Sequence, residues 1–123
     1  MELEKEAMAA CTHEAEHELT AARAKGNMPK DEDIARVAST FKSISAPSRL
    51  KILFALRQGE LCVLHIVAAV GGTQSGVSHQ LRLMKSHGIV KSRREGQNIL
   101  YSLADEHVVA VLELACAHLH CHI

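Results

Sequence analysis

Residues 73–88 read Thr-Gln-Ser-Gly-Val-Ser-His-Gln-Leu-Arg-Leu-Met-Lys-Ser-His-Gly, and they predict a helix with one apolar and one polar face. Thr73 suits the N-cap of this helix, and Gly88 suits its end. Three apolar side chains recur at helical spacing and are expected to face the core: Val77, Leu81 and Met84. The other face then presents side chains that hydrogen-bond to base edges and phosphates: Gln74, Ser75, Ser78, His79 and Arg82. Gly76 in the first turn would let DNA approach the backbone closely.

The segments on both sides of this helix complete a winged helix-turn-helix pattern. Residues 62–70 predict a short helix, and Gly71-Gly72 predicts the turn that follows it. Residues 89–94 and 98–103 predict two strands joined by a turn at residues 95–97. The second helix of such a motif fits the major groove of B-DNA, while a basic hairpin reaches backbone phosphates or the minor groove. The hairpin residues expected to do so are Arg93, Arg94 and Gln97.

Further helices are predicted around residues 12–25, from Asp31 to Ile44, from Pro47 to just before Gly59, and from about Asp105 to the C-terminus. The expected fold class is therefore mainly α with a small β-hairpin, a winged helix-turn-helix that dimerises through its N- and C-terminal helices. Residues 1–28 are expected to form an N-terminal arm with a helix in it. Residues 29–123 are expected to form the winged helix-turn-helix domain with a C-terminal dimerisation and sensing helix.

Charge is distributed unevenly along the chain. The 123 residues carry no net charge, and their 47% hydrophobic and 23% charged residues are typical of a globular protein. Residues 41–103, however, carry nine Lys and Arg against two Glu, a net charge of +7 between acidic ends of −4 and −3. Such a segment favours a polyanionic partner. With only three aromatic residues, double-stranded DNA is favoured over stacked single strands.

Neither a membrane span nor a signal peptide is predicted. No apolar run approaches the roughly 20 residues that cross a bilayer. The charged N-terminus lacks the basic and apolar regions of a secretory signal. We therefore expect a cytoplasmic protein with reduced thiols and no membrane partner.

The chain is rich in metal-ligating side chains, with nine His and four Cys. His107 and His118 share one face of the last helix but lie roughly 16 Å apart at 1.5 Å per residue. Two such helices packed antiparallel in a homodimer would bring Asp105 and His107 of one chain to His118 of the other. Cys121 or His122 would complete a tetrahedral set suited to zinc, and twofold symmetry would give two sites per dimer.

A second candidate metal site involves Cys62 and His65, three residues apart on the predicted short helix. An N-terminal arm carrying Cys11, His13 and His17 would fold over that helix in the same or the partner chain. The alternative is that Cys62 is a small buried apolar residue, as free cysteines often are. Cys116 lies near the apolar stripe of the last helix and is expected in the core.

Two other function classes place different demands on these residues. A thiol-based redox or persulfide regulator on the same scaffold needs two cysteines that meet. Cys116 and Cys121, five residues apart on one helix, are poorly placed for a disulfide within a chain, whereas Cys11 with Cys62 stays open. A small metalloenzyme is disfavoured because the chain lacks an HExxH motif and has little room for a substrate pocket. We therefore expect neither catalysis nor a small organic substrate.

Four motifs in order resemble the ArsR/SmtB family of metal-sensing repressors over about residues 33–121. Residues 60–66 resemble its ELCVCDL metal motif, residues 75–83 its recognition helix, and residues 92–103 its wing. Asp105, His107 and His118 match its C-terminal pattern DxHx10HxxE/H. The resemblance implies a homodimeric winged-helix repressor that binds double-stranded operator DNA without metal and leaves it when metal binds. It also implies that Asp105, His107 and His118 are ligands.

The chain departs from the family pattern at two ligand positions. Cys121 stands where the family has an acid or His, and His122 is its alternative. A thiolate favours softer ions, so Cd(II) joins Zn(II), with Co(II) and Ni(II) as further candidates. In the first motif Leu64 replaces the second Cys and His65 replaces Asp, which weakens a site of three thiolates. Zn(II) is the ion we expect first.

Overall fold

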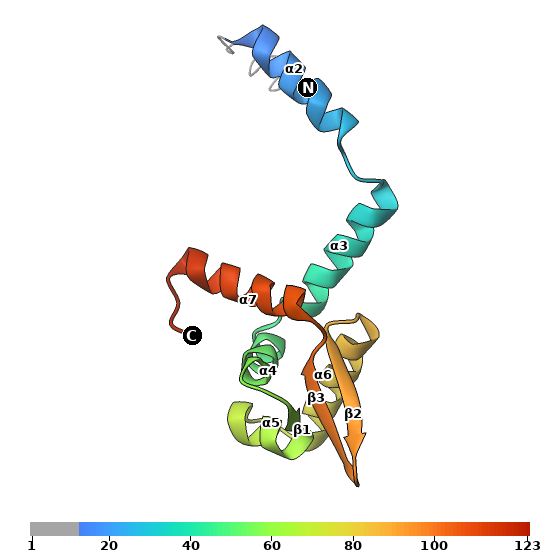
Figure 1. The fold of residues 1–123 in the computed structure, drawn as a ribbon, viewed down its shortest axis with the longest axis vertical. Coiled ribbons are helices and arrows are strands. Elements are labelled where there is room, and N and C mark those ends of the chain that lie inside the picture. Colours follow the sequence, from blue (N-terminus) through green and yellow to red (C-terminus); the bar gives the residue numbers. More distant parts are fainter. Residues whose placement is uncertain (1–12) are drawn as a thin grey trace. The chain divides into compact units, whose positions relative to one another are not determined.

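A computed structural model describes residues 13–123 of the chain (Figure 1). The chain divides after Ala35, and its second compact unit runs from Arg36 to Ile123. This division falls inside a helix and later than the boundary expected after residue 28, which stays a prediction. None of the helices in residues 13–123 is both long enough and apolar enough to cross a membrane.

Two helices lead into the second unit. Helix α2 spans Glu14–Gly26, with Glu14 and Glu16 in its first turn and Arg23 and Lys25 in its last. These charges suit the helix dipole, and no residue of α2 is buried, so charge and not packing favours this helix. Helix α3 spans Asp31–Ile44. Both helices confirm the elements expected from the sequence to within two residues.

The second unit contains the winged helix-turn-helix. After α3 come helix α4 (Pro47–Arg57), strand β1 (Leu61–Cys62), helix α5 (Val63–Val70), helix α6 (Gln74–Ser86), strands β2 (Val90–Glu95) and β3 (Asn98–Leu103), and helix α7 (Glu106–Leu119). Strands β2 and β3 run side by side as an antiparallel hairpin, with Val90 opposite Leu103 (Figure 1). The sheet has three strands in the order β1-β3-β2, not the two that were expected. Strand β1 has only two residues, too few for an alternating pattern to reveal.

The core lies among α4, α5, α6 and the sheet. Leu53, Ile66, Leu81 and Met84 have no exposed surface. Val77, Leu81 and Met84 are all buried, which confirms the predicted inner face of α6. Burying such side chains contributes about 1.5–3 kcal/mol each, so this core fixes how α6 is presented.

Helix α7 differs from its prediction in two ways. It ends at Leu119 instead of continuing to the C-terminus, because His120 adopts a left-handed conformation with φ 59° and reverses the chain. Its apolar residues also divide between two faces. Leu112 and the expected core residue Cys116 are buried, whereas Val111 and Leu119 are exposed.

Candidate DNA-binding surface and metal-ligand clusters

The first turn of α6 is held by a side-chain cap. The Oγ1 atom of Thr73 accepts a hydrogen bond from the Gly76 N–H at 3.0 Å, which confirms Thr73 as the N-cap. A Cβ at position 76 would lie 2.9 Å from this same oxygen. Gly76 therefore leaves room for the capping hydroxyl. The structure thus gives a reason for glycine here that differs from the expected close approach of DNA. The Thr73 cap also sets the residue at which the exposed face of α6 begins.

The polar face of α6 is presented to solvent as expected. Gln74, Ser75, His79 and Arg82 are exposed, and Ser78 is half-buried. Gln80 is not available in the same way, because its side-chain amide exchanges hydrogen bonds of 3.1 and 3.3 Å with the Ser48 hydroxyl on α4. Four of the five predicted reading residues thus stand open on one helix, as insertion into a major groove requires.

Two cationic side chains of the basic segment have structural partners. The Lys85 ammonium at the end of α6 donates to the Ser92 hydroxyl on β2 at 2.6 Å. This bond ties the recognition helix to the hairpin. The Arg49 guanidinium on α4 donates to the Ser43 carbonyl near the end of α3 at 3.0 Å. The charge of +7 is therefore not all free for DNA.

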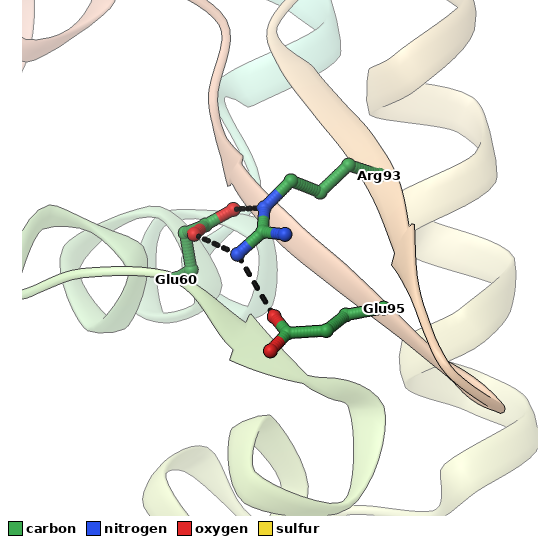
Figure 2. A network of polar contacts seen from close by, with 3 residues as sticks. All are labelled: Glu60, Arg93 and Glu95. Carbon is green, nitrogen blue, oxygen red and sulfur yellow. Dashed lines mark hydrogen bonds and ion pairs between the residues drawn. The ribbon is translucent and has the colours of Figure 1, made fainter.

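Arg93 on β2 is held by two carboxylates (Figure 2). Its guanidinium donates two hydrogen bonds to Glu60, of 2.8 and 2.9 Å, and one of 2.9 Å to Glu95. These bonds lower the pKa of Glu60 and raise that of Arg93. Arg93 was predicted to contact DNA, but in the DNA-free chain three of its five N–H donors, on Nε and Nη2, already serve the two carboxylates. A phosphate would have to compete with Glu60 for them.

The tip of the hairpin is open. Gly96 has φ 62°, the left-handed conformation that a tight hairpin turn needs, and Arg94 and Gln97 beside it are exposed. Within residues 13–123, no hydrogen bond or ion pair involves the Arg94 side chain. Arg94 and Gln97 are therefore better placed than Arg93 to reach a phosphate without a rearrangement.

At the start of α7, Asp105 has a structural role as well as a candidate ligand role. Its Oδ1 atom accepts hydrogen bonds from the N–H groups of His107 at 2.9 Å and Val108 at 3.1 Å. The Val108 bond, followed by that of His107, lowers the pKa of Asp105 and keeps the carboxylate charged. The Nδ1 atom of His107 lies 3.5 Å from the same oxygen. Asp105 and His107 are thus already adjacent and exposed.

A hollow missed by the sequence reasoning lies beside this pair. It measures about 230 Å³ and borders the end of α3 and the start of α7. Asp105, His107 and His87 border it together with apolar side chains that include Phe41 and Val111. His87 follows α6 directly, so the start of α7 and the end of the recognition helix share one hollow. No sequence pattern marked His87, since it is a single imidazole at a helix end.

At the other end of α7, His118 lies in the last turn and Cys121 and His122 follow the reversal at His120. All three are exposed. Among residues 13–123, no three His, Cys, Asp or Glu side chains of one chain gather so that they could hold a metal ion. The structure therefore brings Asp105 to His107 but does not bring either to His118.

In the second candidate metal site, the described residues include one pair of adjacent ligands, Cys62 and His65. Cys62 is the N-cap of α5, and its Sγ atom lies 3.3 Å from the Nδ1 atom of His65. Cys62 is half-buried, so it is not the fully buried residue of the alternative interpretation. His13 and His17 lie at the start of α2 with ring centroids 6.4 Å apart. Cys11 lies outside the described residues.

Comparison with known proteins places these features in one family. Residues 46–92 match the arsR family of bacterial regulatory proteins. The chain is 48% identical over 84 residues to the transcriptional regulator NmtR of Mycobacterium tuberculosis, covering 68% of this chain and 70% of NmtR. It is 41% identical over 103 residues to a cadmium resistance regulatory protein, a CadC homolog of Staphylococcus aureus, covering 83% of this chain and 84% of that protein. A SmtB repressor homolog of Synechocystis sp. is 44% identical over 84 residues, covering 68% of this chain and 64% of that protein.

Solved structures show the same architecture. The solution structure of apo-NmtR matches with a TM-score of 0.65 and 43% identity, over 79% of this chain and 86% of that one. A homodimeric winged helix-turn-helix DNA-binding domain from Mycobacterium bovis matches with a TM-score of 0.67 and 33% identity, over 77% and 95%. The winged helix-turn-helix architecture is thus shared with related proteins, and the chain belongs to the ArsR family of bacterial transcriptional regulators.

Proposed function

We propose that this protein is a metal-responsive repressor, which binds double-stranded operator DNA as a metal-free homodimer and leaves it when Zn(II) or a similar divalent ion binds. Cd(II), Co(II) and Ni(II) are the alternative ions. One observation carries the proposal. Helix α7 holds Asp105 and His107 at one end and His118 and Cys121 at the other, with exposed apolar residues between them.

The exposed apolar residues support the homodimer. On α7, Val111 is 42%, Leu114 69% and Leu119 70% exposed, and on α3 Phe41 is 56% exposed. A surface with several exposed apolar side chains is typical of a protein–protein interface. A second copy of α7 packed antiparallel would cover them. It would also bring the two ligand pairs to each other, because the spacing of the pairs along one helix is the same in both copies.

The ligand set fits a tetrahedral zinc site. Asp105 and His107 of one copy and His118 and Cys121 of a second copy would give one carboxylate oxygen, two imidazole nitrogens and one thiolate. The Oδ1 atom of Asp105 caps the helix, so the other carboxylate oxygen is the one left for the metal. His122 is the alternative to Cys121. Zinc would polarise no substrate here; its role is to join two chains.

The coupling between metal and DNA needs a plausible free energy. Two recognition helices of a dimer read half-sites about one helical turn apart, roughly 34–36 Å. A metal that bridges the α7 helices would fix a dimer shape that no longer fits this spacing. A thousandfold loss of affinity corresponds to about 4 kcal/mol. The coupling is reciprocal, so operator DNA would weaken metal binding by the same factor.

Position 65 and its neighbours define a second proposed site. Cys62 and His65 would supply two ligands, whose Sγ and Nδ1 atoms lie 3.3 Å from each other. Cys11, His13 and His17 would have to supply the others. This site is proposed as an addition to the α7 site and not as its replacement. Substituting Cys62→Ser would remove it while leaving every α7 ligand in place.

The proposal is tested by titrating reduced, metal-free protein with Co(II) under anaerobic conditions and then adding Zn(II). We expect intense visible bands of tetrahedral Co(II) that saturate at one ion per chain for the α7 site, and at two if the Cys62 site fills as well. Zinc should abolish them, and a sulfur charge-transfer band that persists in Cys62→Ser would place Cys121 in the site. Absence of tight tetrahedral binding would contradict the proposal and leave a DNA-binding regulator that does not respond to metal.

A further inference from the structure

We propose that Cys116 and Cys121 form a reversible disulfide within one chain, across the C-terminal end of α7. This inference goes beyond the proposed metal response and does not depend on it. It departs from the expectation that these two cysteines are poorly placed because they lie five residues apart on one helix. The premise of that expectation is wrong, because the helix ends between them, at Leu119.

The end of α7 has the hydrogen bonds of a Schellman motif. The Cys121 N–H donates to the Cys116 carbonyl at 2.8 Å, and the His120 N–H donates to the Ala117 carbonyl at 3.3 Å. His120 supplies the left-handed residue of the motif, with φ 59°. In this motif the side chains at the two positions joined by the bond that spans six residues, here Cys116 and Cys121, frequently pack against each other. In most proteins that pair is apolar, and here it is two thiols.

The surroundings of the pair give the two thiols different roles. Cys116 is 7% exposed, whereas Cys121 is exposed. Both border one hollow of about 400 Å³ with Phe54, Arg57, Gln58, His122 and Ile123. An exposed thiol that meets an oxidant first and a buried thiol beside it are the arrangement of an attacking and a resolving cysteine.

The chemistry balances with a peroxide as the oxidant. The Cys121 thiolate attacks one peroxide oxygen, the O–O bond breaks, and the products are a Cys121 sulfenic acid and, after protonation, one water. The Cys116 sulfur then attacks the Cys121 sulfur, forming the S–S bond and releasing a second water. In total the two thiols lose two protons and two electrons, and the peroxide gains them. A low-molecular-weight thiol or a dithiol reductant reverses the step by exchange through a mixed disulfide.

The sequence allows a direct assay on the full chain. No Lys or Arg follows Arg94, so trypsin releases Glu95–Ile123 as one peptide that contains both cysteines. Cys11 and Cys62 fall in separate peptides, residues 6–23 and 58–82. After treatment of metal-free protein with hydrogen peroxide and alkylation of free thiols, we expect this peptide without alkyl groups and lighter by two hydrogen atoms. Addition of a dithiol reductant after the peroxide and before the alkylation should restore two alkylated cysteines in this peptide. A peptide that stays doubly alkylated, carries added oxygen, or is linked to a second chain would overturn the inference.

Two variants of His120 test whether the cap brings the sulfurs together. Glycine adopts the left-handed conformation freely, so His120→Gly should form the disulfide at least as fast as the parent chain. A β-branched residue resists that conformation, so His120→Val should form it about tenfold more slowly, although both thiols remain. Circular dichroism of each variant checks that the helices are retained. Equal rates in His120→Gly and His120→Val would overturn the role assigned to the cap.

Zinc protection separates this inference from the metal response. If Cys121 is the fourth ligand, bound Zn(II) slows disulfide formation, because a thiolate on the metal is not free to attack peroxide. If His122 is the ligand, zinc leaves the rate unchanged and the disulfide still forms. Failure of the protein to bind zinc would contradict the proposed function and leave the disulfide measured in metal-free protein untouched.

Discussion

Helices α6 and α7 have nearly equal lengths, 13 and 14 residues, but they bury their apolar side chains differently. Helix α6 has one apolar face, and its own chain covers it completely through Val77, Leu81 and Met84. Helix α7 has two, of which one packs inward through Leu112 and Cys116 while the other is exposed. A helix completed by its own chain presents a fixed surface. A helix with one exposed apolar face can pack against a second copy of itself, and a change in that packing changes how the two α6 surfaces of a dimer are arranged. A ligand-controlled repressor needs such a change.

The largest effect is expected from removing a ligand at the half-covered helix. His118→Ala should leave operator affinity of the metal-free protein unchanged and abolish release by Zn(II), a loss of about a thousandfold in the metal effect, or about 4 kcal/mol. Fluorescence anisotropy of labelled operator DNA with and without Zn(II) measures both. His120→Gly is the matched control, because it also removes an imidazole beside the site but keeps the left-handed conformation, and His120 lies outside the proposed ligand set. Release that persists in His118→Ala would remove α7 from the sensing mechanism.

The contrast in burial predicts opposite mutational profiles. Leu81→Ala in α6 should lower the free energy of unfolding by about 2–5 kcal/mol, because Leu81 is fully buried. Leu114→Ala in α7 should change the unfolding of the dilute monomer little, since Leu114 is 69% exposed, but should raise the dissociation constant of the dimer. Chemical denaturation and sedimentation equilibrium separate the two quantities. If Leu114→Ala lowers the free energy of unfolding as much as Leu81→Ala does, the outer face of α7 is packed within its own chain and not against a second one.

The cap of α6 can be tested by a double-mutant cycle. Thr73→Ala should cost about 1 kcal/mol, because the Gly76 N–H loses its acceptor. Gly76→Ala should be unfavourable or neutral in the parent chain, where the new methyl group meets the Thr73 oxygen, and favourable by up to about 1 kcal/mol in Thr73→Ala, where only helix propensity remains. Urea denaturation of the four proteins gives the cycle. Equal effects of Gly76→Ala in both backgrounds would mean that the Thr73 oxygen does not dictate glycine.

The smallest effect is expected at the hairpin. Glu60→Gln should free Arg93 for a phosphate, raise operator affinity a few-fold, and steepen the dependence of log affinity on log salt by up to about one unit. In an Arg93→Ala background the same substitution should lose this effect. An undiminished effect there would show that Glu60 acts only through its overall charge.

The pH dependence of this pair follows from the lowered pKa of Glu60. A carboxylate with a lowered pKa contributes its stabilisation above the ordinary pKa of Glu, 4.5, and loses it as the pH falls through the lowered value. The Glu60–Arg93 pair should therefore be intact at pH 7 and still largely intact near pH 5. Arg93 chemical shifts in a pH titration would report this, and a change centred above pH 5 would contradict it.

The sequence predicted those parts of the molecule in which a short segment carries its own signal. The cap at Thr73, the three-residue core face of α6 and the two strands of the hairpin follow from local periodicity and turn residues, and all agree with the structure to within one residue. Three features did not follow. Strand β1 is too short to show a pattern, the clamp on Arg93 joins residues 33 positions apart, and the reversal at His120 uses a non-glycine residue in a left-handed conformation. The ligand sets on α7 stay predictions, because residues 13–123 of one chain do not contain a complete site.

The central claim is that each α7 site is divided between two chains, and chain mixing tests it most directly. His107→Ala removes a ligand from one end of α7 and His118→Ala from the other, so neither homodimer should hold a complete site. After the two variants are mixed and allowed to exchange, half of the dimers should contain both chains and regain one of two sites, which restores about a quarter of the parent Co(II) absorbance. Recovery near that value is the predicted result. No recovery on mixing, or full binding by either variant alone, would contradict a site shared between chains.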